Sequence, residues 1–236
     1  MKNAINSIAS HAYSMRARGI FLLIAWALTG CALPDKPVRP AVYDFGPGRL
    51  SAPAAKRMTG LAPLVVGEVE ANPALDSTAL LYRLAYADAQ QLHPYALARW
   101  SMTPAQLVRQ RLREHLGQRH ALFNPGDSGL SDAASAPALP TPLTLPAPLT
   151  LRIELEEFSQ LFETPDRSVG LLHLRATLTR ASPSGEKWLA QRSVVVQRPA
   201  PSADAAGGVR AMTAATDAAV LEIDEWLQGL QGHGAD

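Results

Sequence analysis

The histidines are the side chains best suited to hold a metal ion, but their spacing does not favour one. Outside the first thirty residues they are His93, His115, His120, His173 and His233. His115 and His120 are five residues apart, so they do not share a helix face, and no HExxH or paired Cys/His spacing occurs. The sequence therefore predicts mostly solvent-facing histidines and no metal site.

Three neighbouring carboxylates, Glu154, Glu156 and Glu157, are the candidates for acid–base catalysis. Glu154 and Glu156 alternate with apolar residues and share a strand face with Arg152. A catalytic carboxyl needs burial to raise its pKa, and a solvated strand face does not provide that burial. The pattern therefore indicates a charged outer surface.

One tetrapeptide suggests a nucleophile: Gly126-Asp127-Ser128-Gly129 is the sequence around the reactive serine of chymotrypsin-like proteases. Here Leu130 stands where those enzymes continue with Gly-Pro, and the segment is rich in proline. A nucleophile needs a base held within hydrogen-bond reach on a rigid scaffold, so we interpret the motif as a chance turn. Gly207-Gly208 lacks the rest of a phosphate-binding loop. We predict that the chain is not an enzyme, with a lipid-anchored hydrolase using Ser128 as an alternative.

Cys31 is the only cysteine, and it directly follows an N-terminal leader. Residues 1–18 are polar and cationic without an acid, and residues 19–29 are apolar, a run that suits a signal-peptide core but is too short to span a bilayer. The sequence Leu28-Thr29-Gly30-Cys31 resembles the lipobox of bacterial lipoproteins. That resemblance implies cleavage before Cys31, a diacylglycerol on its thiol and an acyl group on the new amino terminus. Two or three such chains anchor a protein stably.

We therefore predict a signal peptide at 1–30 and a lipidated N-terminus with a proline-rich tether at 31–41, and no cofactor besides the covalent lipid on Cys31. Ala32 after the cysteine favours the outer membrane under the sorting rule of such lipoproteins. Removing residues 1–30 takes three of the 22 cations and none of the 21 acids. The slightly acidic remainder does not suit a nucleic-acid-binding protein. We expect a lipid-anchored protein of the cell envelope that faces the periplasm.

The elements that would position these residues follow from hydrophobic periodicity. Alternating apolar residues predict strands at 42–45, 61–70, 80–86, 151–156, 172–179 and 188–197. A helix is expected from Thr103, where Thr-Pro-Ala-Gln forms a capping box, to Gly117. A second amphipathic helix is expected from Val209 to Leu230. This order predicts an α+β fold, with a mostly antiparallel sheet of about five to six strands and two main helices packed on it.

Residues 124–148 interrupt this pattern with six prolines among small residues and few charges. Such a composition does not form a packed element. Because neither side of it has enough strands to close alone, we predict one domain at 42–230 with a Pro/Ala-rich insertion at 124–148, followed by a flexible tail at 231–236.

The stretch from His93 to Pro104, "HPYALARWSMTP", is the most distinctive segment outside the leader. The four-residue spacing of Tyr95 and Arg99 predicts a short helical turn. These residues either pack that turn onto the sheet or form a contact surface, because Tyr, Trp and Arg are common at interface hot spots. Tyr95, Arg99 and Trp100 are therefore candidates for a contact with a partner.

At this stretch the sequence resembles the ABC-type transport auxiliary lipoproteins, a family that includes the PqiC-like lipoproteins. The residues that carry the resemblance are Leu81-Tyr82-Arg83-Leu84, Tyr95, Arg99-Trp100, Pro104 and Leu107, with Val42 to Gly48 and the lipobox upstream. The resemblance covers the mature chain coarsely and residues 80–116 most specifically. The insertion at 124–148 departs from the family pattern.

The resemblance implies an accessory protein that works beside an ABC permease and ATPase and an MCE-domain protein. Such systems are thought to move phospholipids or other hydrophobic molecules between the two membranes of Gram-negative envelopes. The chain would dock as a subunit without catalysis, and a homo-oligomer is left open. The alternative is an envelope structural or assembly lipoprotein that is unrelated to a transporter.

Overall fold

The computed structural model describes residues 38–48, 62–127, 148–182 and 184–232. Cys31, the predicted signal peptide, residues 31–37 of the tether, Ser128 and most of the insertion lie outside the described residues. The predicted domain boundaries, including the tail at 231–236, therefore stay predictions. The described residues from Pro40 onward belong to one compact unit.

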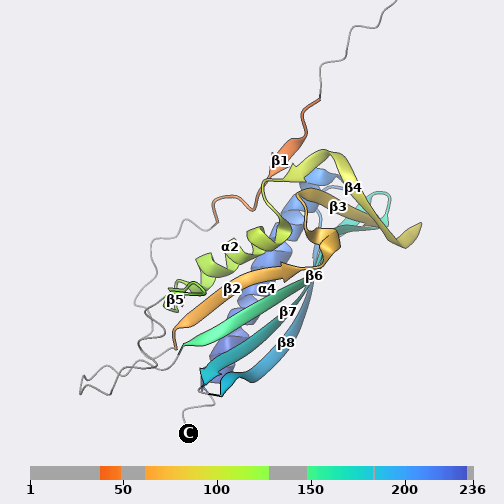
Figure 1. Cartoon of the computed structure of the whole chain (residues 1–236). Helices are drawn as coiled ribbons and strands as arrows, with labels where there is room; N and C mark the ends of the chain where they lie inside the picture. Colours follow the sequence, from red (N-terminus) through yellow and green to blue (C-terminus); the bar gives the residue numbers. More distant parts are fainter. Residues whose placement is uncertain (1–37, 49–61, 128–147, 183, 233–236) are drawn as a thin grey trace, which may run out of the picture. The chain divides into compact units, whose positions relative to one another are not determined.

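This unit is an α+β fold with one mixed sheet and two α-helices among its described residues (Figure 1). The strands are β1 (Ala41–Tyr43), β2 (Leu64–Ala71), β3 (Ala79–Leu84), β4 (Asp88–Trp100), β5 (Leu122–Phe123), β6 (Leu149–Thr164), β7 (Arg167–Ser182) and β8 (Gly185–Pro199). The helices are α2 (Pro104–Leu116), α4 (Ala205–Gly232) and a short 3₁₀ turn, η1 (Pro73–Leu75).

Strand β6 organises the sheet because it pairs along both sides. On one side β2 and β3 follow each other along β6 and run parallel to it, β2 beside residues 149–155 and β3 beside residues 160–162. On the other side β7 and β8 continue the sheet as the antiparallel meander that the alternating residues predict. β4 pairs antiparallel with β3, and β1 and β5 close the ends of the strand order β1-β4-β3-β6-β2-β5.

The expected sheet of five to six mostly antiparallel strands is wrong in number and direction. The described residues form eight strands, and four of their seven pairings are parallel. β2 and β3 are not paired with each other: η1 lies between them in the chain, and both strands follow the same side of β6 and run parallel to it. The alternation of apolar and polar residues along a strand does not indicate whether the strand pairs parallel or antiparallel with its neighbour.

The helical turn expected around Tyr95 is also wrong, because this segment is the strand β4. Ala98 and Trp100 are buried, whereas Leu97 and Arg99 are exposed, which is the two-residue alternation of a strand. β1 pairs with one side of this stretch and β3 with the other. Pairing with β3, and with β1 at residues 98–100, gives this segment the extended conformation of a strand, although the spacing of its residues also fits a helix.

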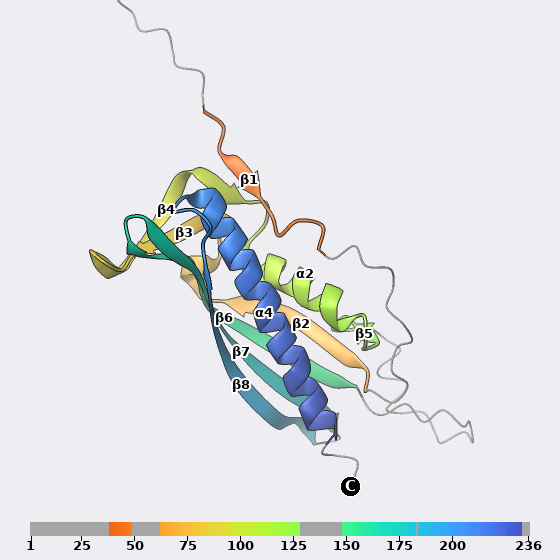
Figure 2. The same ribbon diagram turned by 180° about the vertical axis from the view of Figure 1, so that it is seen from behind.

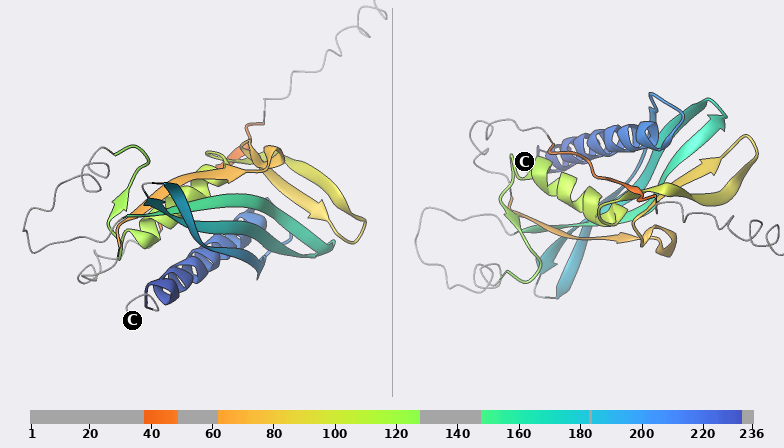
Figure 3. Two further views of the ribbon diagram at one scale, coloured as in Figure 1. Left: turned by 60° about the horizontal axis from the view of Figure 1, so that its bottom comes forward. Right: turned by 90° about the horizontal axis from the view of Figure 1, so that it is seen from above.

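Both predicted helices are confirmed. The capping box of α2 is complete: Thr103 Oγ1 accepts from the Gln106 amide at 3.4 Å, and Gln106 Oε1 accepts from the Thr103 amide at 3.1 Å. α4 contacts β6, β7 and β8, while α2 contacts β2 and α4. Both helices cover the same face of the sheet (Figures 2 and 3).

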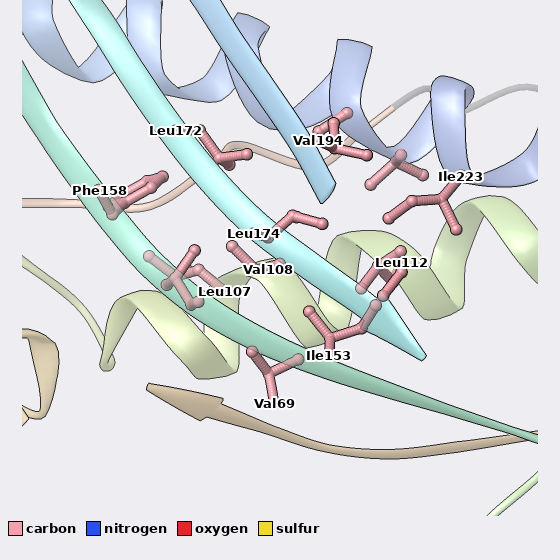
Figure 4. Packing of buried hydrophobic residues seen from close by; sticks show 14 of the residues in the cluster. Val69, Leu107, Val108, Leu112, Ile153, Phe158, Leu172, Leu174, Val194 and Ile223 are labelled. Carbon is pink, nitrogen blue, oxygen red and sulfur yellow. The ribbon is translucent and has the colours of Figure 1, made fainter. Parts of the chain in front are cut away.

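The core lies between this face and the helices (Figure 4). Its members are alternate residues of the strands and one stripe of each helix, among them Val69, Leu107, Val108, Leu112, Ile153, Phe158, Leu172, Leu174, Val194 and Ile223. Burial of these apolar side chains is the main force that holds the layers together. In the described part of the chain, neither helix has the length and hydropathy needed to cross a membrane.

Candidate functional site

Tyr95 lies in a half-buried aromatic cluster on β3, β4 and β6. Its ring is 4.7 Å from the ring of Tyr82, which also stacks on His93 at 5.2 Å and meets Phe162 at 5.8 Å. The Tyr95 hydroxyl donates to Gln160 Oε1 at 2.9 Å, and Gln160 Nε2 donates to a serine hydroxyl of β7 at 2.7 Å. The hydroxyl is therefore held by the sheet, while part of the ring is open to solvent.

Burial is the main reason why the pKa of Tyr95 rises to about 12, and the nearby Tyr82 and Asp204 add to the effect. A phenol with this pKa stays neutral at physiological pH, so it donates its hydrogen bond rather than acting as a base. The Tyr95 hydroxyl is therefore suited to hold a hydrogen bond rather than to transfer a proton.

The structure separates the three candidate contact residues. Trp100 is 1% exposed and packs in the core, with its ring 5.6 Å from those of Phe45 and Phe158. This is the packing role that the sequence left open. Arg99 is exposed, and Tyr95 is half-buried. A contact between these residues and a partner stays a prediction.

Arg111, on α2, connects the two helices to the segment that follows β1. Its Nη2 donates to the carbonyl oxygen of Phe45 at 2.6 Å, and its guanidinium lies 5.7 Å from the centre of the Phe45 ring. Its Nε is 3.3 Å from a carboxylate oxygen of Asp217 on α4. The residue is 9% exposed. Because Phe45 also packs on Trp100, Arg111 holds the start of the folded unit against its core.

Asp224, on α4, makes the second charged link between the helices. Its Oδ2 lies 3.3 Å from Nε2 of His115 and 3.7 Å from Nε of Arg119, both in or just after α2. Its Oδ1 is buried and has no hydrogen-bond partner among the described residues. Burial by itself would raise the pKa of Asp224, but the hydrogen bonds from His115 and Gln228 and the charge of Arg119 outweigh it, so the pKa is lowered.

Sequence reasoning did not select Arg111 or Asp224, although a signal exists for each. Arg111 comes three residues after Val108, and Asp224 comes four residues after Val220, so both border an apolar helix stripe. A charge at the border of a buried stripe needs a partner, and the structure supplies that partner from the other helix.

The carboxylates at residues 154–157 form ion pairs on the sheet face that the helices leave open. Arg175 contacts Glu154 at 3.2 Å and also contacts Glu156, which in turn lies 3.0 Å from His173. Glu157 pairs with Arg83 at 2.9 Å. The prediction of a charged outer surface at Glu154 and Glu156 is confirmed.

The four histidines that the structure describes, His93, His115, His120 and His173, do not lie together, and His233 lies outside the described residues. His120 is 1% exposed, with Nδ1 3.4 Å from the carbonyl oxygen of Ala62, so the prediction of a solvent-facing side chain is wrong for this residue. His115 pairs with Asp224, His93 stacks on Tyr82, and His173 contacts Ser193 at 2.9 Å. Among the described residues no group of three or more His, Cys, Asp and Glu side chains could hold a metal ion.

A family model described as the ABC-type transport auxiliary lipoprotein component matches residues 43–224. The match begins in β1 and ends in α4, so it spans both helices and the sheet. No curated protein matches the chain.

Two examples illustrate the solved structures that are similar to this fold. One is the crystal structure of protein XCC0632 from Xanthomonas campestris, of the family model DUF330, with a TM-score of 0.56, 19% identity and coverage of 73% of this chain and 87% of that chain. The other is an uncharacterized protein with a TM-score of 0.51, 12% identity and coverage of 80% and 99%. At these identities the likeness shows the fold alone.

Proposed function

Because the chain belongs to the family of ABC-type transport auxiliary lipoprotein components, we propose that it is the lipid-anchored, periplasm-facing docking subunit of an ABC transporter of the MCE type. Such a system would move phospholipids or other hydrophobic molecules between the membranes of the Gram-negative envelope. The observation that carries the proposal is the family match over residues 43–224, downstream of the lipobox at Cys31.

The proposed docking surface is the outward side of β4 and the aromatic cluster beside it. Leu97 is 56% exposed and Arg99 is exposed on the same side of the strand, while the half-buried ring of Tyr95 adds an aromatic contact. Tyrosine and arginine are side chains expected at an interface centre, and the exposed leucine adds apolar area beside them. Trp100 acts as a positioning residue, because its packing in the core holds β4 in place.

The proposal assigns no catalytic reaction to the chain. The carboxylates at residues 154–157 are engaged in ion pairs on an open surface, and the neutral Tyr95 is a hydrogen-bond donor. We propose lipidation of Cys31 as the anchor and the outer membrane as the site, on the basis of the lipobox and Ala32.

The test is photo-crosslinking in living cells from a photoreactive amino acid at position 99, with one at Gln110, an exposed residue of α2, as the matched control. We expect position 99, but not position 110, to capture an MCE-domain protein or the periplasmic side of an ABC permease. Capture of cell-wall or outer-membrane assembly factors alone would favour the structural alternative and reject the transporter role. Replacement of Ser128 by Ala should leave the envelope phenotype unchanged, and a phenotype would favour the hydrolase.

A further inference from the structure

Strand β8 is a long free edge of the sheet. It has 15 residues and, among the described elements, pairs with β7 alone. In an antiparallel ladder every second residue of an edge strand directs its N–H and C=O groups away from the sheet. These outward groups can pair with an extended segment of another chain.

The regularity of β8 distinguishes it from the other edges of the described sheet. Its pairing with β7 has one register shift, at Leu189, and none over the ten residues from Ala190 to Pro199. β4 is also free along residues 88–97, but it contains Pro94 and has two register shifts against β3, features that protect natural edges from pairing. β1 and β5 have only three and two residues.

An open groove of about 420 Å³ runs between β8 and the last turns of α4. It is lined by Arg192, Glu222, Glu225, Trp226, Gly229 and Leu230; Arg192 is paired with Glu222, and Leu230 is 38% exposed. On the other face of the sheet, Trp188 and Val195 are 61% and 59% exposed. A strand added to β8 would place alternate side chains on these two faces, one set beside Trp226 and Leu230 of α4 and one set beside Val195.

The two ends of the edge carry cations without acidic partners. Lys187 lies directly opposite Arg180 of β7, and no ion pair of either is present among the described residues. Like charges placed opposite each other destabilise a sheet. At the other end, Arg198 donates only to the carbonyl oxygen of Gln197 at 3.0 Å. In contrast, Arg192 in the middle of the strand is paired with Glu222 of α4 at 2.7 Å.

We propose that the edge of β8 and the groove beside α4 form a strand-addition site for an extended segment of a partner protein, with apolar side chains at alternate positions and acidic side chains at its ends. Main-chain hydrogen bonds would hold the segment, the groove would select its apolar side chains, and the terminal acids would pair with Lys187 and Arg198. The inference does not depend on the proposed function, because it uses neither the anchor nor β4.

Charge and backbone chemistry favour this occupant over two others. A second copy would bring its own β8 to the edge. β8 carries the cations Lys187, Arg192 and Arg198, and its single acid, Glu186, is already paired with Arg152, so two copies would repel. Residues 128–147 of the same chain contain four prolines and a single acid. Because proline has no N–H group, that segment is a poor partner for a regular ladder.

The test uses the full chain, purified in detergent, and a fluorescent twelve-residue peptide that has aspartate at both ends and alternates valine and threonine between them, because the stretch of β8 from Lys187 to Arg198 is twelve residues long. We expect saturable binding in fluorescence anisotropy. N-methylation of alternate main-chain amides keeps the charge and side chains, and it should weaken binding about tenfold or more because the ladder cannot form. The double change Lys187→Glu with Arg198→Glu should weaken it to a similar extent and should instead favour a peptide with lysine ends.

The matched control is Lys187→Arg with Arg198→Lys, which keeps both charges and should bind the aspartate peptide as well as the unchanged chain does. Equal binding of the N-methylated and unmethylated peptides, or no binding at millimolar peptide, would overturn the proposal. Both results are obtained with the unchanged chain, so they do not depend on whether a protein variant folds. If the unchanged chain associates with itself and the double change to glutamate abolishes this association, the edge of β8 binds a second copy of the chain. If deletion of residues 128–147 makes the peptide bind more tightly, that segment of the same chain occupies the edge of β8. Self-association or this result would each contradict the proposal that a partner protein occupies the edge.

Discussion

Arg111 and Asp224 show how single charged residues join parts of this chain that are distant in sequence. Arg111 reaches the carbonyl oxygen of Phe45 and the carboxylate of Asp217, and Asp224 reaches back from α4 to His115. A buried charge is tolerated only when it is paired. Because one partner of each pair lies on the other helix, these contacts set how α2 and α4 pack on each other.

The pKa of Asp224 leads to a prediction about acid stability. Since its pKa is lowered in the folded chain, Asp224 stabilises the fold at pH values above the unfolded-state pKa of about 3.9. That contribution is lost as the pH falls through the lowered folded-state value. Replacement of Asp224 by Asn should therefore reduce the free energy of unfolding by about 1–3 kcal/mol at pH 7 and by less at pH 3.

Urea unfolding at both pH values measures this difference. Replacement of Asp217 by Asn is a suitable comparison, because its side chain is 51% exposed and its ion pair should contribute less to stability. An Asp224→Asn variant that lost the same stability at pH 3 as at pH 7 would show that the ionised carboxylate is not what stabilises the contact.

At the scale of the elements, α4 packs on the sheet through points of close main-chain approach. A Cβ atom at Gly170 of β7 would overlap the main chain of Ala211 and Met212 in α4, and a Cβ atom at Gly208 would overlap the side chain of Gln160. Glycine lets the helix and the strands approach closely at both positions. Neither glycine was selected from the sequence as a packing residue, because its role depends on a partner distant in the chain.

Replacement of Gly170 by Ala should lower the free energy of unfolding by about 1–3 kcal/mol, because α4 must move away from β7 to admit the methyl group. Replacement of Gly67 by Ala in β2 is the control, since its Cβ would lie 3.7 Å from the nearest atom and should change stability by no more than about 1 kcal/mol. Thermal unfolding of the two variants compares them. Equal stability would mean that the helix and β7 adjust without strain.

The elements also differ in how well the sequence predicts them. α2 was predicted closely because its capping box and apolar stripe are local signals, and the β6–β7–β8 meander because its residues alternate over long stretches. β4 was misread because the spacing of Tyr95 and Arg99 fits a helix as well as a strand. Pairing with β1 and β3, which lie outside the local window, decides between the two conformations.

At the scale of the whole molecule, the proposed function combines a membrane anchor at one end of the chain with a folded unit that contacts partners. The anchor is predicted from residues 1–31, and the family match covers residues 43–224. Each of several acyl chains adds to membrane affinity at about 0.8 kcal/mol for each buried CH₂ group. The unit would therefore act within reach of the membrane that holds its lipid.

Replacement of Cys31 by Ser should abolish lipidation and prevent cleavage of the leader before residue 31. Intact-mass measurement of the protein purified from membranes would show the mass of the lipid on the unchanged chain and its absence from the variant. Replacement of Ala32 by Asp is the control: it should keep the lipid and move the protein to the inner membrane in a density gradient. An unmodified thiol with an intact leader in the unchanged chain would remove the basis for the proposed location.

The sequence by itself determined the features that depend on neighbouring residues and that the structure and the family match confirm: the two amphipathic helices, the alternating strands from residue 151 to residue 197 and the motif that resembles the family. The leader and the lipobox are also local patterns, and they stay predictions. Only the tertiary structure decided the parallel placement of β2 and β3 along β6, the strand conformation of β4, the burial of Trp100 and Arg111, and the free edge of β8. The physical reason is that strand pairing and burial arise between residues far apart in the chain. A local pattern of apolar residues indicates that a face is buried, but it does not identify the element that covers that face.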